Sequence, residues 1–80
     1  MTWQIEVTDT FGGEANYSWV RRYTMPHKEG ERQRDTMRRA KAIAGYTGTR
    51  GRSSHYGDML EFRPYRICHV LFITWCDDAS

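Results

Sequence analysis

Two runs of alternating apolar and polar residues flank a glycine pair near the start of the chain. Residues 3–8 and 17–20 place apolar side chains at every second position, and Gly12 and Gly13 lie between them. Alternation is typical of a half-buried strand, and a glycine pair readily adopts the positive φ angles that hairpin turns require. We therefore expect a β-hairpin, whose second strand ends at Pro26 because proline lacks the amide donor of a strand ladder.

A helix is predicted over residues 31–44. Its small and apolar residues recur at the spacing of one helical stripe, which comprises Thr36, Met37, Ala40, Ile43 and Ala44. Acidic residues come early and basic residues late, the order that the helix dipole favours. Gly45 is expected to end the helix. At the other end, no residue that precedes the helix is a strong N-cap.

The second half of the chain predicts two more strands. Residues 46–54 have turn composition and predict a flexible basic loop, and residues 58–63 alternate. Residues 66–76 are apolar on both faces, as expected of a central strand or of a strand whose second face meets a partner. Eighty residues allow one domain, spanning 1–80. The predicted fold class is α+β with the order ββαββ, an antiparallel sheet of about four strands and one helix on one face.

One helix leaves the other sheet face open. That face is predicted to hold either small polar residues or exposed aromatic and arginine side chains. On the second strand Tyr17, Trp19 and Tyr23 share a face with Arg21. Trp19 is expected to face the helix, whereas for Tyr17 and Tyr23 core packing and exposure at an interface both stay open.

Charge is distributed unevenly along the chain. Residues 21–52 hold ten basic and three acidic residues, whereas the rest holds two basic and seven acidic residues. Ten of the twelve basic residues are arginine, whose forked guanidinium binds carboxylate and phosphate. An anionic or mixed-charge partner is therefore expected.

Catalytic and metal-site motifs are missing from the sequence. The two cysteines and three histidines form no C-x-x-C or H-x-x-x-H spacing; they are Cys68, Cys76, His27, His55 and His69. No phosphate-binding loop, nucleophile elbow or dinucleotide fingerprint occurs either. We expect no enzyme activity, no metal and no cofactor.

The cysteines and the length of the apolar runs indicate the cellular compartment in which the protein is expected. On one strand Cys68 and Cys76 would lie ~26 Å apart at ~3.3 Å per residue, too far for a disulfide. No secretory leader and no apolar run long enough to span a bilayer is evident. A cytoplasmic location without membrane contact is expected.

The basic helix and the loop after it suggest nucleic-acid binding as one function. Arg34, Arg38 and Lys41 form one set at helical spacing, and the loop arginines could reach phosphates. The alternative is that this helix face is simply solvated, with its positive charge reduced by nearby acidic residues. The predicted contact residues of this hypothesis are Arg32, Arg38, Arg39, Arg50 and Arg52.

Several motifs resemble small phage and prophage proteins of unassigned function. They are the W-x-I-x-V-x-D opening at residues 3–9, the G-G-E-A-N-Y-x-W-V-R-R run at residues 12–22, the R-R-A-K-x-x-A-G helix end at residues 38–45 and the Y-G-D triplet at residues 56–58. By analogy with phage proteins of this size, the resemblance implies a counter-defence protein of the anti-CRISPR kind. Its location would be the cytoplasm of a bacterial host.

The resemblance implies a steric inhibitor of a bacterial defence complex, with a type I CRISPR surveillance complex as the expected target. Aromatic residues would anchor the interface, and acidic residues, with Glu6 and Asp9 among them, would meet basic groups of the effector. The predicted partner-binding residues are Tyr17, Arg21, Tyr23, Glu14, Asp58 and Glu61. A homodimer formed through the open sheet face is a third hypothesis.

Overall fold

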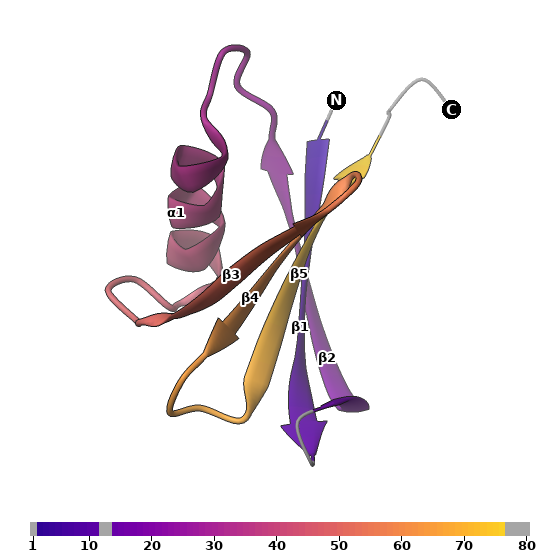
Figure 1. Cartoon of the computed structure of the whole chain (residues 1–80). Coiled ribbons are helices and arrows are strands. Elements are labelled where there is room, and N and C mark those ends of the chain that lie inside the picture. The colour runs from indigo at the N-terminus through magenta and orange to yellow at the C-terminus, as the bar shows by residue number, and fades with distance from the viewer. Residues whose placement is uncertain (1, 12–13, 77–80) are drawn as a thin grey trace.

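The computed structural model describes residues 2–11 and 14–76. These residues form five strands and one helix (Figure 1). Their bounds are β1 Thr2–Phe11, β2 Glu14–Pro26, α1 Gln33–Ala44, β3 Gly51–Tyr56, β4 Met59–Pro64 and β5 His69–Cys76. The α+β class with a helix between strands is confirmed, and the order is ββαβββ.

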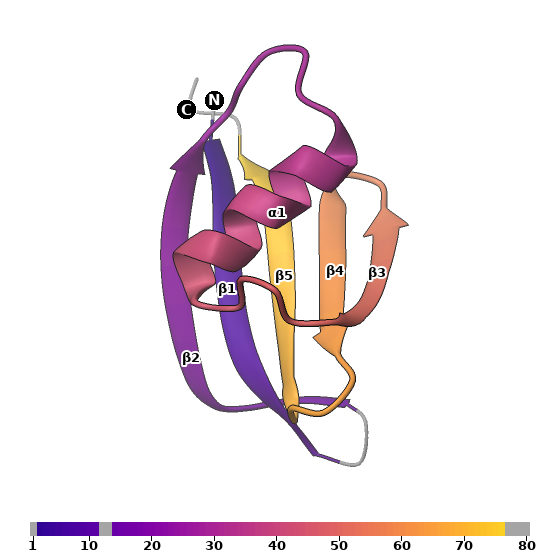
Figure 2. The same ribbon diagram turned by 90° about the vertical axis from the view of Figure 1, so that its left-hand side faces the viewer.

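The sheet is antiparallel throughout, with the order β2-β1-β5-β4-β3. Figure 2 shows α1 lying across one face of this sheet. β5 lies at the centre, which confirms that the most apolar run of the chain forms a central strand. Leu71 and Ile73 of β5 are buried beneath the helix, and Val70 is buried on the opposite face of the strand.

The sheet has five strands where about four were predicted, because residues 51–56 form a strand of their own. β3 pairs with β4 through a tight turn at Gly57 and Asp58, where Gly57 has a φ of 54°. Its composition is polar and does not favour a strand, so pairing with β4 decides its structure. A Cβ on Gly51 would collide with the carbonyl oxygen of Arg63, which makes glycine necessary where the strand begins.

The first hairpin extends further than predicted, since β2 begins at Glu14 rather than at Tyr17. The ladder between β1 and β2 shifts register between Thr8 and Thr10, and Tyr17 lies opposite this irregularity with a φ of 57°. The predicted turn at residues 12 and 13 lies outside the described residues. The end of β2 at Pro26 is confirmed.

The helix begins two residues later than predicted and ends where expected. Gly45 adopts a left-handed φ of 88°, and its amide donates to the carbonyl of Ala42. Arg32 precedes the helix without a side-chain cap, as the sequence indicated. Ile43 was assigned to the buried stripe but is 41% exposed, because the buried positions follow the 36, 37, 40, 44 spacing.

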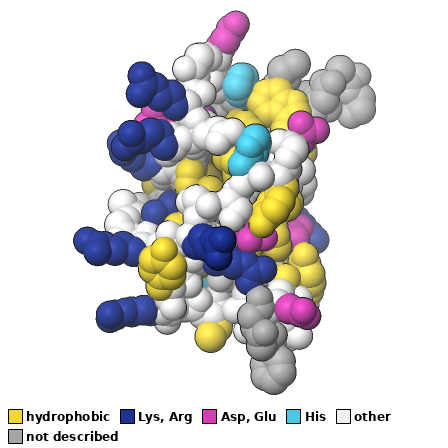
Figure 3. Space-filling model, viewed as in Figure 1, with side chains coloured by type: hydrophobic (Ala, Val, Ile, Leu, Met, Phe, Trp, Pro, Cys, Tyr) yellow, Lys and Arg dark blue, Asp and Glu magenta, His cyan; other side chains and the backbone are white. Residues whose placement is uncertain are grey.

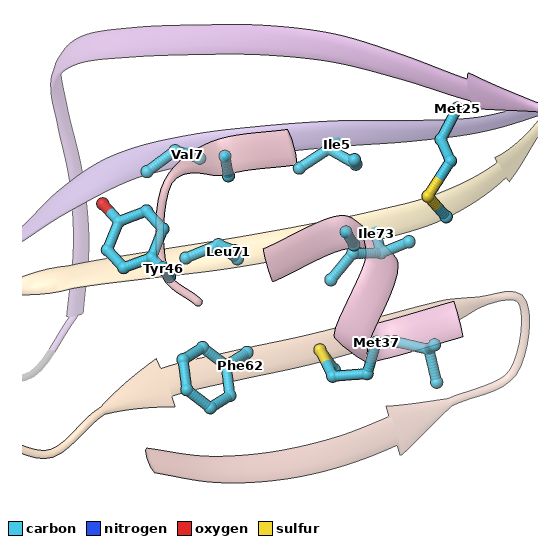
Figure 4. Close-up of a cluster of buried hydrophobic side chains, with 11 residues drawn as sticks. Ile5, Val7, Met25, Met37, Tyr46, Phe62, Leu71 and Ile73 are labelled. Carbon is cyan, nitrogen blue, oxygen red and sulfur yellow. The ribbon is translucent and has the colours of Figure 1, made fainter. Parts of the chain in front are cut away.

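The core lies between α1 and the sheet (Figure 4). Ile5, Leu71 and Ile73 are fully buried on the sheet, and Ala40 lets the helix approach them closely. Tyr46 closes the core beyond the helix, and Trp19 packs against it as predicted. The remaining members of the core are Val7, Met25, Met37, Ala44, Leu60 and Phe62.

The other face of the sheet is mainly polar. Strand alternation and register place Arg22, Glu6, Phe72 and Glu61 in one row across β2, β1, β5 and β4. We call the side of the sheet that carries this row the open face. This row holds paired arginines and glutamates and half-buried Phe72, so neither small polar residues nor an exposed aromatic and arginine group describes it alone.

Candidate nucleic-acid interface

Part of the arginine content stabilises the fold. Among residues 2–11 and 14–76, ion pairs join Arg22 to Glu6 at 3.3 Å, Arg39 to Glu31 at 2.7 Å and Arg63 to Glu61 at 2.9 Å. Two of these pairs lie on the open face. The third lies where the chain enters the helix.

The pair of Arg39 and Glu31 anchors the segment between β2 and α1. Glu31 accepts from Nε and Nη2 of Arg39, both at 2.7 Å, and from the hydroxyl of Thr36 at 2.9 Å. Arg39 also donates to the carbonyl of Pro26 at 3.0 Å. These bonds lower the pKa of Glu31 and raise that of Arg39, because each stabilises the charged form. Arg39, predicted to bind nucleic acid, is thus engaged within the protein.

Other arginines are exposed and have no ion pair with any described residue. Figure 3 shows Lys and Arg gathered on the left-hand side, over α1 and the segment that follows it. The exposed arginines without an ion pair to a described residue are Arg21, Arg32, Arg34, Arg38, Arg50, Arg52 and Arg66. Of these, Arg52 lies opposite Arg63 in the register and therefore belongs to the open face.

Three adjoining hollows lie on the helix side of the described residues. A hollow of about 340 Å³ between α1 and β3 shares Arg34 and Met37 with one of about 640 Å³ between α1 and the turn at residues 47–48. The latter shares Gly48 with a third of about 500 Å³. The three hollows therefore adjoin one another at these shared residues.

The three hollows are lined by basic residues. Together we call them the basic groove, which we define by Arg34, Arg38, Lys41, Arg50 and Arg66. No described Asp or Glu lines any of the three hollows. The positive charge in the groove is therefore not neutralised by any residue that lines it, although α1 carries Asp35 in its first turn.

Lys41 connects the helix to the turn that carries Arg50. Its Nζ donates to the carbonyl of Thr49 at 2.7 Å and lies 4.4 Å from the centre of the Phe62 ring. The amide of Tyr46 donates to the carbonyl of Lys41 at 2.7 Å. These contacts set the position of Arg50 relative to α1.

Tyr65 and Arg66 complete the groove, and the sequence analysis missed both. Tyr65 is 73% exposed and its amide donates to the carbonyl of Arg50 at 3.1 Å. Residue 66 was assigned to a strand that in fact begins at His69. An aromatic residue and an arginine directly after the strand-breaking Pro64 were the available signal.

The residues predicted to bind a protein partner do not form one surface. Tyr17 is 54% exposed beside exposed Glu14, at the far end of the first hairpin. Arg21 lies 5.2 Å from the centre of the Trp19 ring, and Tyr23 packs against the core. Asp58 occupies the turn between β3 and β4, and Glu61 pairs with Arg63 on the open face.

Asp9, also expected at a protein interface, organises the hairpin irregularity. It accepts from the amide of Ser18 at 3.0 Å and from the side chain of Asn16 at 3.1 Å. Hydrogen bonds from Ser18 and then Asn16 lower the pKa of Asp9 to about 2. Its carboxylate is therefore already bound within the protein.

The histidines and cysteines lie apart. Within the part of the chain that the structure describes, no three His, Cys, Asp or Glu residues cluster as a metal site would require. Both cysteines are free. His69 lies 2.6 Å from the hydroxyl of Tyr46, whose pKa is raised by burial, and its ring contacts Trp19 edge-on. Tyr46, His69 and Trp19 together close one end of the core.

Comparison with known proteins adds no relative. No protein-family model, curated protein or solved structure matches the chain. The resemblance to phage proteins therefore stays a prediction.

Among the described residues, no helix is long and apolar enough to cross a membrane. What characterises this chain is an open-faced α+β fold with unneutralised arginines beside its helix.

Proposed function

We propose that this protein binds nucleic acid through the basic groove and does so without catalysing a reaction. The observation that carries the proposal is the lining of the groove. Five basic side chains border it and no described acidic residue does. Phosphates supply the complementary charge, and arginine binds them through two parallel hydrogen bonds.

The distribution of acidic residues supports this assignment. Glu6, Glu31 and Glu61 pair with arginines outside the groove, and Asp9 is held by the hairpin backbone. The net charge of +2 therefore understates the positive potential beside α1. A polyanion approaching the molecule is attracted to that side.

A salt titration of binding tests the proposal. Fluorescence anisotropy of a labelled oligonucleotide would be followed as salt is raised. With four arginines on phosphates, the logarithm of the binding constant should fall against that of salt with a slope of about −3 to −4. Absence of a complex at low salt would refute the proposal.

Single charge removals locate the site. Arg38→Gln should lower the magnitude of the slope by ~0.7–0.9 because one phosphate contact is lost. Arg52→Gln removes the same charge from the open face and is the matched control. Equal losses in both variants would mean that binding is not confined to the groove.

Inhibition of a bacterial defence complex is a second candidate function. The observation that favours it is the exposure of Tyr17 at 54%, within the run that carries the phage resemblance. Co-purification with a type I CRISPR effector and protection of phage in a plaque assay test it. Tyr17→Ala should weaken both, since exposed aromatic residues anchor interfaces. Dimerisation through the open face stays a prediction that light scattering tests.

A further inference from the structure

Tyr65 is the most exposed large hydrophobic residue among those described. Its side chain is 73% exposed, although its backbone amide is bound to the carbonyl of Arg50. The backbone is therefore held in place while the ring faces solvent. Packing in the core therefore does not explain why an aromatic side chain occupies position 65.

The ring stands at one end of the basic groove. Tyr65 lines the same hollow as Arg50 and Arg66, and Ile67, 38% exposed, extends the apolar surface. An aromatic ring beside arginines combines a stacking surface with phosphate ligands. Proteins that bind single strands use this combination, because every base has a π face.

Duplex nucleic acid cannot use such a ring in the same way. Both faces of a paired base are covered by the neighbouring bases, so stacking on a side chain requires unstacking. Single strands offer uncovered bases without that cost.

We infer that the basic groove takes single-stranded nucleic acid and that Tyr65 stacks on an unpaired base at its Arg50 and Arg66 end. The inference rests on the proposed function and narrows its ligand. The backbone of the strand passes Arg34 and Arg38 along α1 and reaches Tyr65 past Gly48, following the residues that the hollows share.

The experiment compares three probes on the full chain. They are an oligothymidylate and an oligouridylate of about 20 nucleotides and a duplex of the same length, longer than the ~4–16 nucleotides that a single OB fold covers. Wild-type protein should bind the single strands about tenfold or more tightly than the duplex. The two single-stranded probes distinguish DNA from RNA as the preferred strand.

Variants of Tyr65 test the stacking contact. Tyr65→Ala should weaken binding to oligothymidylate by about fivefold to a hundredfold, whereas Tyr65→Phe, which keeps the ring, should stay within about twofold of wild type. The salt slope should not change in either variant, because no charge is lost. Tyr56→Ala removes a ring that is 56% exposed outside the groove and is the matched control.

Each outcome decides the inference. Equal or tighter binding of the duplex by wild-type protein overturns it without any variant, and so does unchanged affinity in Tyr65→Ala. Either result leaves the proposed function standing, because the nucleic acid is still bound. Absence of binding to all three probes at low salt refutes the proposed function itself.

Discussion

Among the described residues, two of the three arginines of the open face are paired with glutamates, whereas no arginine of the basic groove is. On the open face Arg22 and Arg63 lie beside Glu6 and Glu61, within 3.3 Å and 2.9 Å. In the groove Arg38 and its neighbours have no acidic partner among the described residues. An exposed pair contributes little to stability and its charges cancel. The abundance of arginine is thus uninformative, and the position of the glutamates decides where charge remains available.

Reversing charge in the groove should have the largest effect. The double variant Arg38→Glu and Arg50→Glu should weaken nucleic-acid binding roughly 100-fold or more, since hydrogen bonds to charged groups contribute about 1.5–3 kcal/mol each. Anisotropy at constant salt measures the change. The matched control is Arg32→Glu with Arg52→Glu, which alters net charge equally outside the groove. Similar losses in both would contradict a local site.

The network of Glu31 should matter for stability instead of binding. Glu31→Gln is expected to lower the free energy of unfolding by about 1–3 kcal/mol, because half-buried Arg39 loses its charged partner. Urea denaturation measures it. Glu61→Gln, whose partner Arg63 is more exposed, should cost at most about 1 kcal/mol and serves as the control.

The same network gives a pH dependence with a defined sign. The pKa of Glu31 is lowered in the folded state, so its stabilisation is complete above the ordinary glutamate pKa. It is lost as pH falls through the lower folded pKa. Glu31→Gln should therefore flatten the loss of stability in acid. An unchanged acid profile would mean that the pair contributes nothing.

Loosening the turn beside the helix should have a smaller effect on binding. Lys41→Met removes the bond to the carbonyl of Thr49, the cation over the Phe62 ring and one charge. We expect binding to weaken about threefold to tenfold, the loss of one charged contact. Lys28→Met removes the same charge from an exposed segment and should have less effect. Equal effects would argue that Lys41 acts only through net charge.

Removing an arginine from the open face should have the smallest effect. Arg22→Gln should change the free energy of unfolding by less than about 1 kcal/mol, because its pair with Glu6 is exposed. Nucleic-acid affinity should stay within about twofold. Urea denaturation and anisotropy measure the two quantities. A loss of affinity as large as that of Arg38→Gln would move the binding surface to this face.

Local sequence patterns were sufficient to predict the structure of segments that contact mainly their neighbours along the chain. The first hairpin, the end of β2 at Pro26 and the end of the helix at Gly45 follow from alternation, the missing proline donor and a left-handed glycine. β3 could not be predicted in this way, since its polar residues become a strand only by pairing with β4.

The candidate site was predicted only in part for the same kind of reason. Arg38 and Arg50 were identified because basic residues are visible in a sequence. Arg39 was included although Glu31 binds it, and Tyr65 was missed although it borders the groove. Each error concerns a contact between residues that lie eight or more positions apart.

The α+β class, a central apolar strand within residues 66–76 and an excess of arginine in the middle of the chain could be predicted from the sequence. These properties depend on periodicity and composition, which are local. Which arginines are paired, and that Tyr65 stands beside Arg50, became known from the fold. The physical reason is that charge neutralisation and exposure depend on distances across the fold, which the order of residues does not state.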